Sequence, residues 1–183
     1  MVGLMMLWLP ILLSSVFVFI ASNILWMALP FWHYKDYGRL ENDKPVLDAL
    51  KSVKSGQYIV PFMDWKTMTP EQRQEVQTWP AAFMLVRNPG KFALGKALVS
   101  YFLYAVVISV LVAYITGRTR GAGAHYLEVF RIAGAVTFVA YAFRGVPDAI
   151  WYGKPWRVVF KELVDGLIFA GLTGGTFGWL WPK

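Results

Sequence analysis

Long apolar runs alternate with one charge-rich stretch along the chain. No charged side chain occurs from residue 1 to residue 32, and further apolar runs cover roughly residues 92–116, 126–143 and 163–181. About 20 apolar residues are enough for a helix to cross a bilayer. The pattern predicts an all-α membrane protein with four transmembrane helices, the third of which can continue to residue 151.

The stretch between the first two spans predicts a small α+β insert. Apolar residues recur at helical spacing after Asp43, which is a suitable N-cap residue. Residues 57–60 and 82–86 have the composition of short strands, and residues 69–72 form a capping box with proline at the first helical position. The predicted order is helix, strand, helix, strand.

These patterns divide the chain into three parts. Residues 1–32 form the first transmembrane helix, residues 33–91 form the insert, and residues 92–183 form helices two to four with short loops. An insert of this size buries little core by itself. We therefore expect it to rest on the membrane or on a partner, with amphipathic side chains such as Trp65 and Trp79 at the boundary.

The composition agrees with a membrane location. Hydrophobic residues make up 57% of the chain and charged residues 16%, whereas a globular domain has about 45–50% and about 25% respectively. The chain contains no cysteine. This excludes disulfides, thiolate nucleophiles and cysteine-ligated metals.

The distribution of positive charge predicts the orientation. The two loops at residues 31–91 and 144–162 hold thirteen Lys and Arg residues, whereas the opposite face has three, namely Arg118, Arg120 and Lys183. The positive-inside rule places the insert in the cytoplasm and both termini outside, in a bacterial inner (cytoplasmic) membrane. The same rule accounts for the net charge of +7, so no nucleic-acid partner is predicted.

Motifs for catalysis or for a resident cofactor are absent from the sequence. Neither a glycine-rich phosphate loop nor a G-x-S-x-G nucleophile motif occurs. The two histidines, His33 and His125, are expected at opposite faces of the bilayer and cannot jointly hold a haem. Each is a candidate ligand only for a single group. We predict no catalytic or metal site and no cofactor of its own, although a lipid or a partner-held pigment is compatible with the sequence.

The middles of the predicted spans carry no ionisable group in this interpretation, which argues against a proton pump. Polar residues such as Ser14, Asn23 and Ser109 are interpreted as hydrogen-bonding groups between helices. Glu128 and Arg131 lie near the outer end of the third span and predict a structural ion pair or an inter-subunit contact rather than a proton relay.

Packing signals are stronger than catalytic ones. The fourth span carries a ridge of small residues at Gly171, Gly174, Gly175 and Gly178. Such a ridge lets another helix approach closely, either within the bundle or from a different membrane protein. The turn before this span is aromatic and basic, and its residues Trp151, Trp156 and Arg157 are typical of an interface with lipid phosphates or protein.

Four short motifs carry a resemblance to known sequences. They are LPFWH at residues 29–33, DYGRL at 36–40, GQY at 56–58 and WYGKPW at 151–156, followed by a glycine-rich last span. With them the chain resembles an uncharacterised group of small bacterial multi-pass inner-membrane proteins. The group has no assigned activity, so the resemblance implies an architecture and a location but gives no residue a catalytic role.

Two functions are compatible with these features. The first is a non-catalytic accessory or structural subunit of a larger bacterial inner-membrane complex, such as a respiratory or photosynthetic one, with other integral membrane subunits and lipids as partners. The alternative is a small membrane transporter, channel or lipid-handling protein, which a continuous polar cavity through the bundle, reaching Asn23 or Ser109, would favour. An enzyme is a third possibility that no motif supports.

Overall fold

The computed structural model describes residues 1–64 and 66–183, so Trp65 lies outside the described residues. The chain forms two compact units. The helical unit comprises Met1–Gly38 and Ala93–Lys183, and the insert unit comprises Arg39–Phe92. Residues 33–38, which the sequence assigned to the insert, therefore belong to the helical unit.

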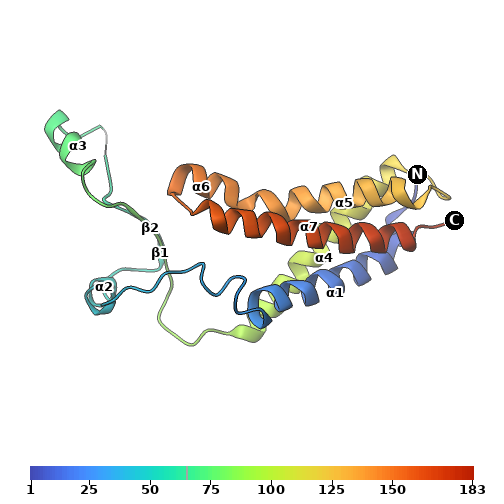
Figure 1. Cartoon of the computed structure of the whole chain (residues 1–183), viewed down its shortest axis with the longest axis horizontal. Helices are drawn as coiled ribbons and strands as arrows, with labels where there is room; N and C mark the ends of the chain where they lie inside the picture. The colour runs from blue at the N-terminus through green and yellow to red at the C-terminus, as the bar shows by residue number, and fades with distance from the viewer. Residues whose placement is uncertain (65) are drawn as a thin grey trace. The chain divides into compact units, whose positions relative to one another are not determined.

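The helical unit is built from four long helical segments (Figure 1). α1 (Trp8–Asn23) is preceded by a 3-10 turn (Leu4–Leu7) and continues into a π-helical turn (Ile24–Ala28). α4 (Leu94–Thr119) and α5 (Tyr126–Ala142) follow, and a 3-10 turn (Phe143–Gly145) joins α5 to α6 (Val146–Tyr152). The last helix is α7 (Trp156–Trp179).

Three of these segments are long and apolar enough to cross a membrane. They are Leu4–Ala28, Leu94–Thr119 and Tyr126–Tyr152, the last of which combines α5 and α6. The first three predicted spans are thus confirmed by length and composition. α7 is a helix of similar length, but four charged residues in its first three turns and many glycines and threonines lower its apolar content. The fourth span stays a prediction.

Two buried clusters hold the four segments together. The cluster near the chain termini contains one large residue from each segment, namely Leu7, Val112, Val129 and Phe177. The second cluster, near the other end, also includes a residue from each segment, namely Val18, Ala105, Tyr141 and Phe169. Between them the Ser14 hydroxyl donates a 3.1 Å hydrogen bond to the Ser109 hydroxyl, which confirms the predicted polar contact between helices.

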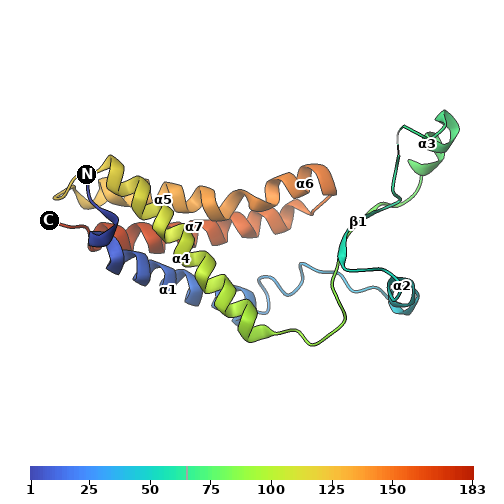
Figure 2. The same ribbon diagram turned by 180° about the vertical axis from the view of Figure 1, so that it is seen from behind.

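Both chain termini lie at the same end of the helical unit, beside the α4–α5 loop (Figures 1 and 2). The Val2 amide donates to the Gly117 carbonyl and the Gly123 amide to the Pro182 carbonyl, each at 2.8 Å. α1 ends and α4 begins at the opposite end, where the chain leaves for the insert unit and returns.

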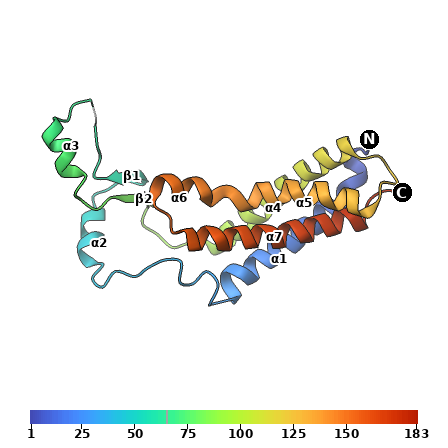
Figure 3. The ribbon, with the colours of Figure 1, turned by 45° about the horizontal axis from the view of Figure 1, so that its top comes forward.

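α5 and α7 lie side by side along their length, and small residues on α7 make this possible (Figure 3). A Cβ atom added to Gly174 would lie 2.9 Å from the Phe130 carbonyl oxygen, and one added to Gly178 would lie 2.7 Å from the Tyr126 ring. Gly166 is as tightly packed against Ala142. These glycines share one face of α7 and form an intramolecular seam.

The rest of the predicted ridge lies off this seam. A Cβ atom on Gly171 would have no neighbour within 4 Å, and one on Gly175 would approach only the Tyr126 hydroxyl, at 3.7 Å. The ridge seen in the sequence therefore consists of two neighbouring rows, of which one packs within the chain.

The insert unit has the predicted order helix, strand, helix, strand. Its elements are α2 (Lys44–Leu50), β1 (Gly56–Val60), α3 (Pro70–Val76) and β2 (Ala82–Val86). β1 and β2 pair antiparallel, with Gly56 opposite Val86 and Val60 opposite Ala82. None of the described residues in 39–92 is fully buried, as expected for so small a unit.

The helix starts of the insert unit confirm one predicted cap and correct another. Thr69 and Gln72 form both hydrogen bonds of the capping box. Asp43 occupies the N-cap position of α2, but its side chain makes no capping hydrogen bond. The Asn42 side chain instead accepts the Lys44 amide at 3.2 Å. Asp43 has helical backbone angles, whereas a residue whose side chain caps a helix has extended ones, and Pro45 offers no amide at the second helical position.

We expect Gly174→Leu to destabilise the protein, because no side chain fits between Gly174 and the Phe130 backbone. Overpacking of this kind costs about 1–3 kcal/mol and should lower the unfolding midpoint of the detergent-solubilised protein. Gly171→Leu is the matched control, on the same helix but facing open space. Equal midpoints for the two variants would contradict the seam.

Candidate functional site

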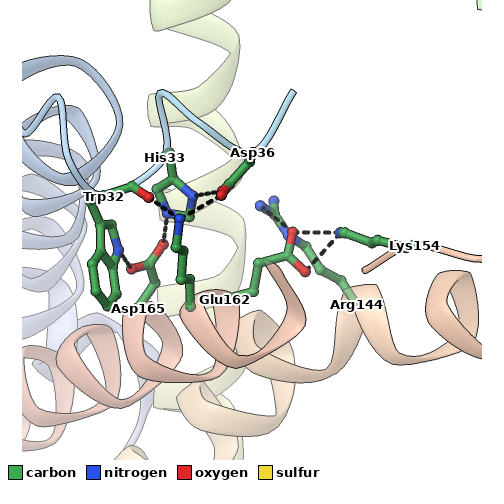
Figure 4. A network of polar contacts seen from close by, with 8 residues as sticks. Trp32, His33, Asp36, Arg144, Lys154, Glu162 and Asp165 are labelled. Atoms are coloured by element: carbon green, nitrogen blue, oxygen red, sulfur yellow. Dashed lines mark hydrogen bonds and ion pairs between the residues drawn. The ribbon is translucent and has the colours of Figure 1, made fainter. Parts of the chain in front are cut away.

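Eight residues form a polar cluster at the end of the helical unit where α1 ends, and Figure 4 shows their arrangement. They are Trp32, His33, Asp36, Arg144, Lys154, Lys161, Glu162 and Asp165. The first three come from the loop after α1, and the last three from the first turns of α7. The other two come from the turns on either side of α6. Segments far apart in sequence thus meet at one place.

His33 lies at the centre of one half of the cluster. Its Nδ1 is 2.6 Å from Asp36 Oδ2 and its Nε2 is 2.8 Å from Asp165 Oδ2. The Trp32 indole N–H donates to the other Asp165 oxygen at 2.7 Å. The His33 ring also stacks on Trp26, with centroids 3.8 Å apart and an interplanar angle of 11°. His33 and Asp165 are only 4% and 3% exposed, so both depend on these partners.

A lysine completes this half of the cluster. Ionised carboxylates only accept hydrogen bonds, so Asp36 and Asp165 depend on donors from their neighbours. Lys161 lies 2.5 Å from Asp36 Oδ1 and also donates to the Trp32 carbonyl oxygen. Its positive charge therefore pairs with the Asp36 carboxylate.

The ionisation of Asp36 reflects these neighbours. Burial raises the pKa of this carboxyl, but the hydrogen bonds from Lys161 and His33, together with their positive charges, outweigh burial. The pKa of Asp36 is therefore lowered from its ordinary value.

Glu162 lies at the centre of the other half and is 4% exposed. Lys154 Nζ approaches its two oxygens at 2.7 and 2.8 Å, whereas Arg144 Nη2 lies 3.4 Å from one of them. Gly145 makes room for this pair, because a Cβ atom there would collide with the Glu162 carboxylate. Gly153, at φ 71°, ends α6 and begins the turn that brings Lys154 back to α7.

A cavity of about 350 Å³ lies beside the polar cluster. Its charged end is formed by Arg144, Glu162 and Asp165. Its other walls are mostly aromatic and apolar, with residues from α1, α4, α5 and α7. Each of the four helical segments therefore contributes to one partly open cavity.

One hydroxyl facing this cavity lacks a partner. Tyr141 is 7% exposed and its ring packs edge-on against Tyr104 and Phe169. Among the described residues, none forms a hydrogen bond with its hydroxyl, and the hydroxyl oxygen is not one of the fully buried unpaired atoms. The hydroxyl is therefore accessible and available to a bound molecule.

The cavity does not run through the bundle. It reaches Ser22 and Asn23, but Ser109 does not line it. Ser109 is buried against Ser14, and the core cluster around Val112 and Phe177 fills the bundle beyond it.

The two histidines singled out in the sequence lie at opposite ends of the helical unit. Both ring nitrogens of His33 contact carboxylates, so neither is free for a metal or a haem iron in this arrangement. His125 is exposed and caps α5, where its Nδ1 accepts the Leu127 amide at 3.3 Å. Among the described residues no group of three or more His, Asp or Glu side chains could hold a metal ion.

The other predicted site residues lie apart from the cluster. Trp151 and Trp156 are more than half exposed, and Arg157 is exposed as well. Glu128 forms its ion pair with Arg120, at 3.4 Å, and not with Arg131. The short α4–α5 loop brings Arg120 to the first turn of α5. The alternative, an inter-subunit contact of Glu128 and Arg131, stays a prediction.

Sequence reasoning missed the acidic residues Asp36, Glu162 and Asp165. A signal for them exists: Lys161, Glu162 and Asp165 lie at helical spacing at the start of an apolar helix, where unpaired charges would be costly. The spacing of His33 and Asp36 is a second such signal.

Comparisons of the chain with protein-family models, with curated proteins and with solved structures found no match. Function is therefore inferred from the cavity and the polar cluster themselves.

Replacing Asp36 with Asn should lower the unfolding midpoint at pH 6–7, because Lys161 and His33 lose a charged acceptor, which costs roughly 1–3 kcal/mol. Since the pKa of Asp36 is lowered on folding, its contribution is complete above the unfolded-state pKa of about 3.9. It is lost as the pH falls through the folded value. The difference between wild type and variant should therefore shrink below about pH 4.

Asp48→Asn is the control for this measurement. Asp48 also lies between two lysines, Lys44 and Lys51, but all three side chains are exposed. Exposed ion pairs contribute little, so this variant should unfold like the wild type. A D36N variant as stable as wild type at pH 6 would show that the contacts of Asp36 with His33 and Lys161 do not stabilise the fold.

Proposed function

We propose that this protein is a multi-pass membrane protein of the lipid-handling or small-transporter class, which binds an amphipathic small molecule in the cavity beside the polar cluster. The observation that carries the proposal is the cavity itself. Small-molecule sites occupy about 300–1,000 Å³ and have mostly apolar walls with a few convergent polar groups. This cavity has a volume in that range. Its walls are mostly apolar, with Leu98 and Phe169 among the apolar residues, and Arg144 lies at its charged end.

Several features favour binding over conduction. The cavity ends before the Ser14–Ser109 hydrogen bond, and residues with no exposed surface, such as Val112 and Phe177, fill the bundle beyond. A molecule in the cavity would therefore enter and leave at the same end unless the helices move apart.

The proposal includes four membrane-spanning helices, the fourth of which is α7. α7 has 24 residues and runs beside α5, so its length of about 36 Å matches a hydrocarbon core of about 30 Å. Its charged residues are grouped in its first turns, where they belong to the polar cluster. With the loops rich in Lys and Arg facing the cytoplasm, the cavity lies near the cytoplasmic face of a bacterial inner membrane and both termini lie outside.

Reporter fusions test this topology. Alkaline phosphatase fused after Lys183 should be active, and a green fluorescent protein fused there should not fluoresce, because the C-terminus is expected outside the cytoplasm. A fusion within the α4–α5 loop at Gly121 should behave in the same way. Opposite results at Gly121 and Lys183 would show that α7 does not cross the membrane.

An accessory subunit of a larger inner-membrane complex is the second candidate. The exposed surface of Trp151, Trp156 and Arg157 favours it, since Trp and Arg are enriched where proteins dock. The glycines of the α5–α7 seam no longer support it, because they pack within the chain. Co-purification of a second integral membrane protein in mild detergent is its test, and such a partner could also hold a pigment or lipid.

Filling the cavity tests the leading proposal. Ala97 on α4 lines the cavity, so Ala97→Phe should abolish the rise in unfolding midpoint that a bound single-chain amphiphile produces. Val99→Phe is the matched control: Val99 is 61% exposed and does not line the cavity. Dodecanoate, dodecyl phosphate, dodecanol and dodecyltrimethylammonium serve as probes, because they share a tail and differ in head group. The proposal fails if none of them stabilises the wild type, or if A97F responds like V99F.

A further inference from the structure

We propose that the cavity selects amphiphiles with an anionic head group, a carboxylate or a phosphate, and that Arg144 is the residue that binds this head group. The inference rests on the proposed function, since it names the class of molecule that the cavity takes.

Arg144 is the most weakly paired cation of the polar cluster. Lys161 lies 2.5 Å from Asp36 Oδ1, and Lys154 contacts the two oxygens of Glu162 at 2.7 and 2.8 Å. Among the described residues, Arg144 makes no carboxylate contact shorter than 3.4 Å, and it lines the cavity.

The contacts of Arg144 support the same conclusion. Its one ion pair, with Glu162, is 3.4 Å long and goes to an oxygen that already accepts from Lys154 at 2.7 Å. The Arg144 side chain is 55% exposed and lines the cavity. A guanidinium has five N–H donors in a planar fork that matches a carboxylate or a phosphate. In the part of the chain that the structure describes, Glu162 is the acceptor found for this fork, so most of its donors remain free for a ligand.

The unpaired hydroxyl of Tyr141 is a second donor at this cavity. It belongs to the α5 residue that lies three positions before Arg144, on the same side of the helix. A head-group oxygen bound by Arg144 could accept from this hydroxyl too. The apolar side chains of Leu98, Met27 and Phe169 would then cover the first part of the tail.

A cationic head group fits these residues poorly. The carboxylates of Glu162 and Asp165 each accept two short hydrogen bonds from the protein. The Trp26 ring, which could otherwise hold a cation, already stacks on His33 and lies 5.7 Å from the Arg144 guanidinium. An added cation would meet Arg144 as a like charge.

The experiment measures binding of the four C12 probes to the full chain in phosphatidylcholine nanodiscs, at equal free concentrations. Wild type should bind dodecanoate and dodecyl phosphate about tenfold or more tightly than dodecanol and dodecyltrimethylammonium, because a charged hydrogen-bonded pair contributes that much. Arg144→Gln should remove this preference and keep the affinity for dodecanol, which would show that the cavity itself is intact. Arg144→Lys should keep part of the preference.

Arg157→Gln is the matched control, since it removes an exposed arginine from the same end of the helical unit without touching the cavity. Its preference should equal that of wild type. The inference is overturned if wild type binds the uncharged or cationic probe as tightly as the anionic ones, or if R144Q and R157Q behave alike. Inorganic phosphate alone competing as well as dodecyl phosphate would also overturn it, in favour of a free-anion site. Absence of binding by all four probes would instead refute the proposed function.

Discussion

The hydrogen bonds that His33 and Trp32 make to Asp165 hold the cavity end of the molecule together. Asp165 lies on α7, the last helix, whereas its two donors follow the first helix, α1. The contact therefore joins the first and the last helical segments of the chain. A carboxylate this deeply buried would be costly without donors. Because Asp165 also lines the cavity, the same contact that connects α1 to α7 fixes one wall of the cavity.

The rest of the polar cluster follows from the need to balance this buried charge. His33 brings a second carboxylate, Asp36, and Asp36 requires Lys161, which lies one turn before Asp165 on the same face of α7. Glu162 is turned toward α6, where Lys154 neutralises it. In this arrangement Lys161 and Lys154 make the short ion pairs, whereas Arg144 makes a longer contact and lines the cavity, where we propose that it binds a ligand.

Much of the architecture could be predicted because it depends on local patterns. Apolar runs indicate the first three spans, and caps and turn residues such as Thr69 and Gln72 determine the order of elements in the insert unit. The partners of Asp165 could not be predicted in this way, because residues 33 and 165 are brought together only by packing of α1 against α7. The cavity has the same origin, since four helical segments contribute to it.

The sequence of α7, the fourth long helical segment, predicts a helix but does not predict what its glycines contact. Glycines on α7 could face lipid, a partner or another helix of the same chain, and the sequence does not distinguish the two rows. Packing does: Gly174 and Gly178 contact backbone and ring atoms of α5, whereas Gly171 faces open space. A helix that is covered by its neighbour on one face, and whose charged groups are paired within the protein, can tolerate fewer apolar residues than a helix exposed to lipid on all sides. The low apolar content of α7 is therefore the consequence of its two tasks, close packing against α5 and formation of the charged end of the cavity.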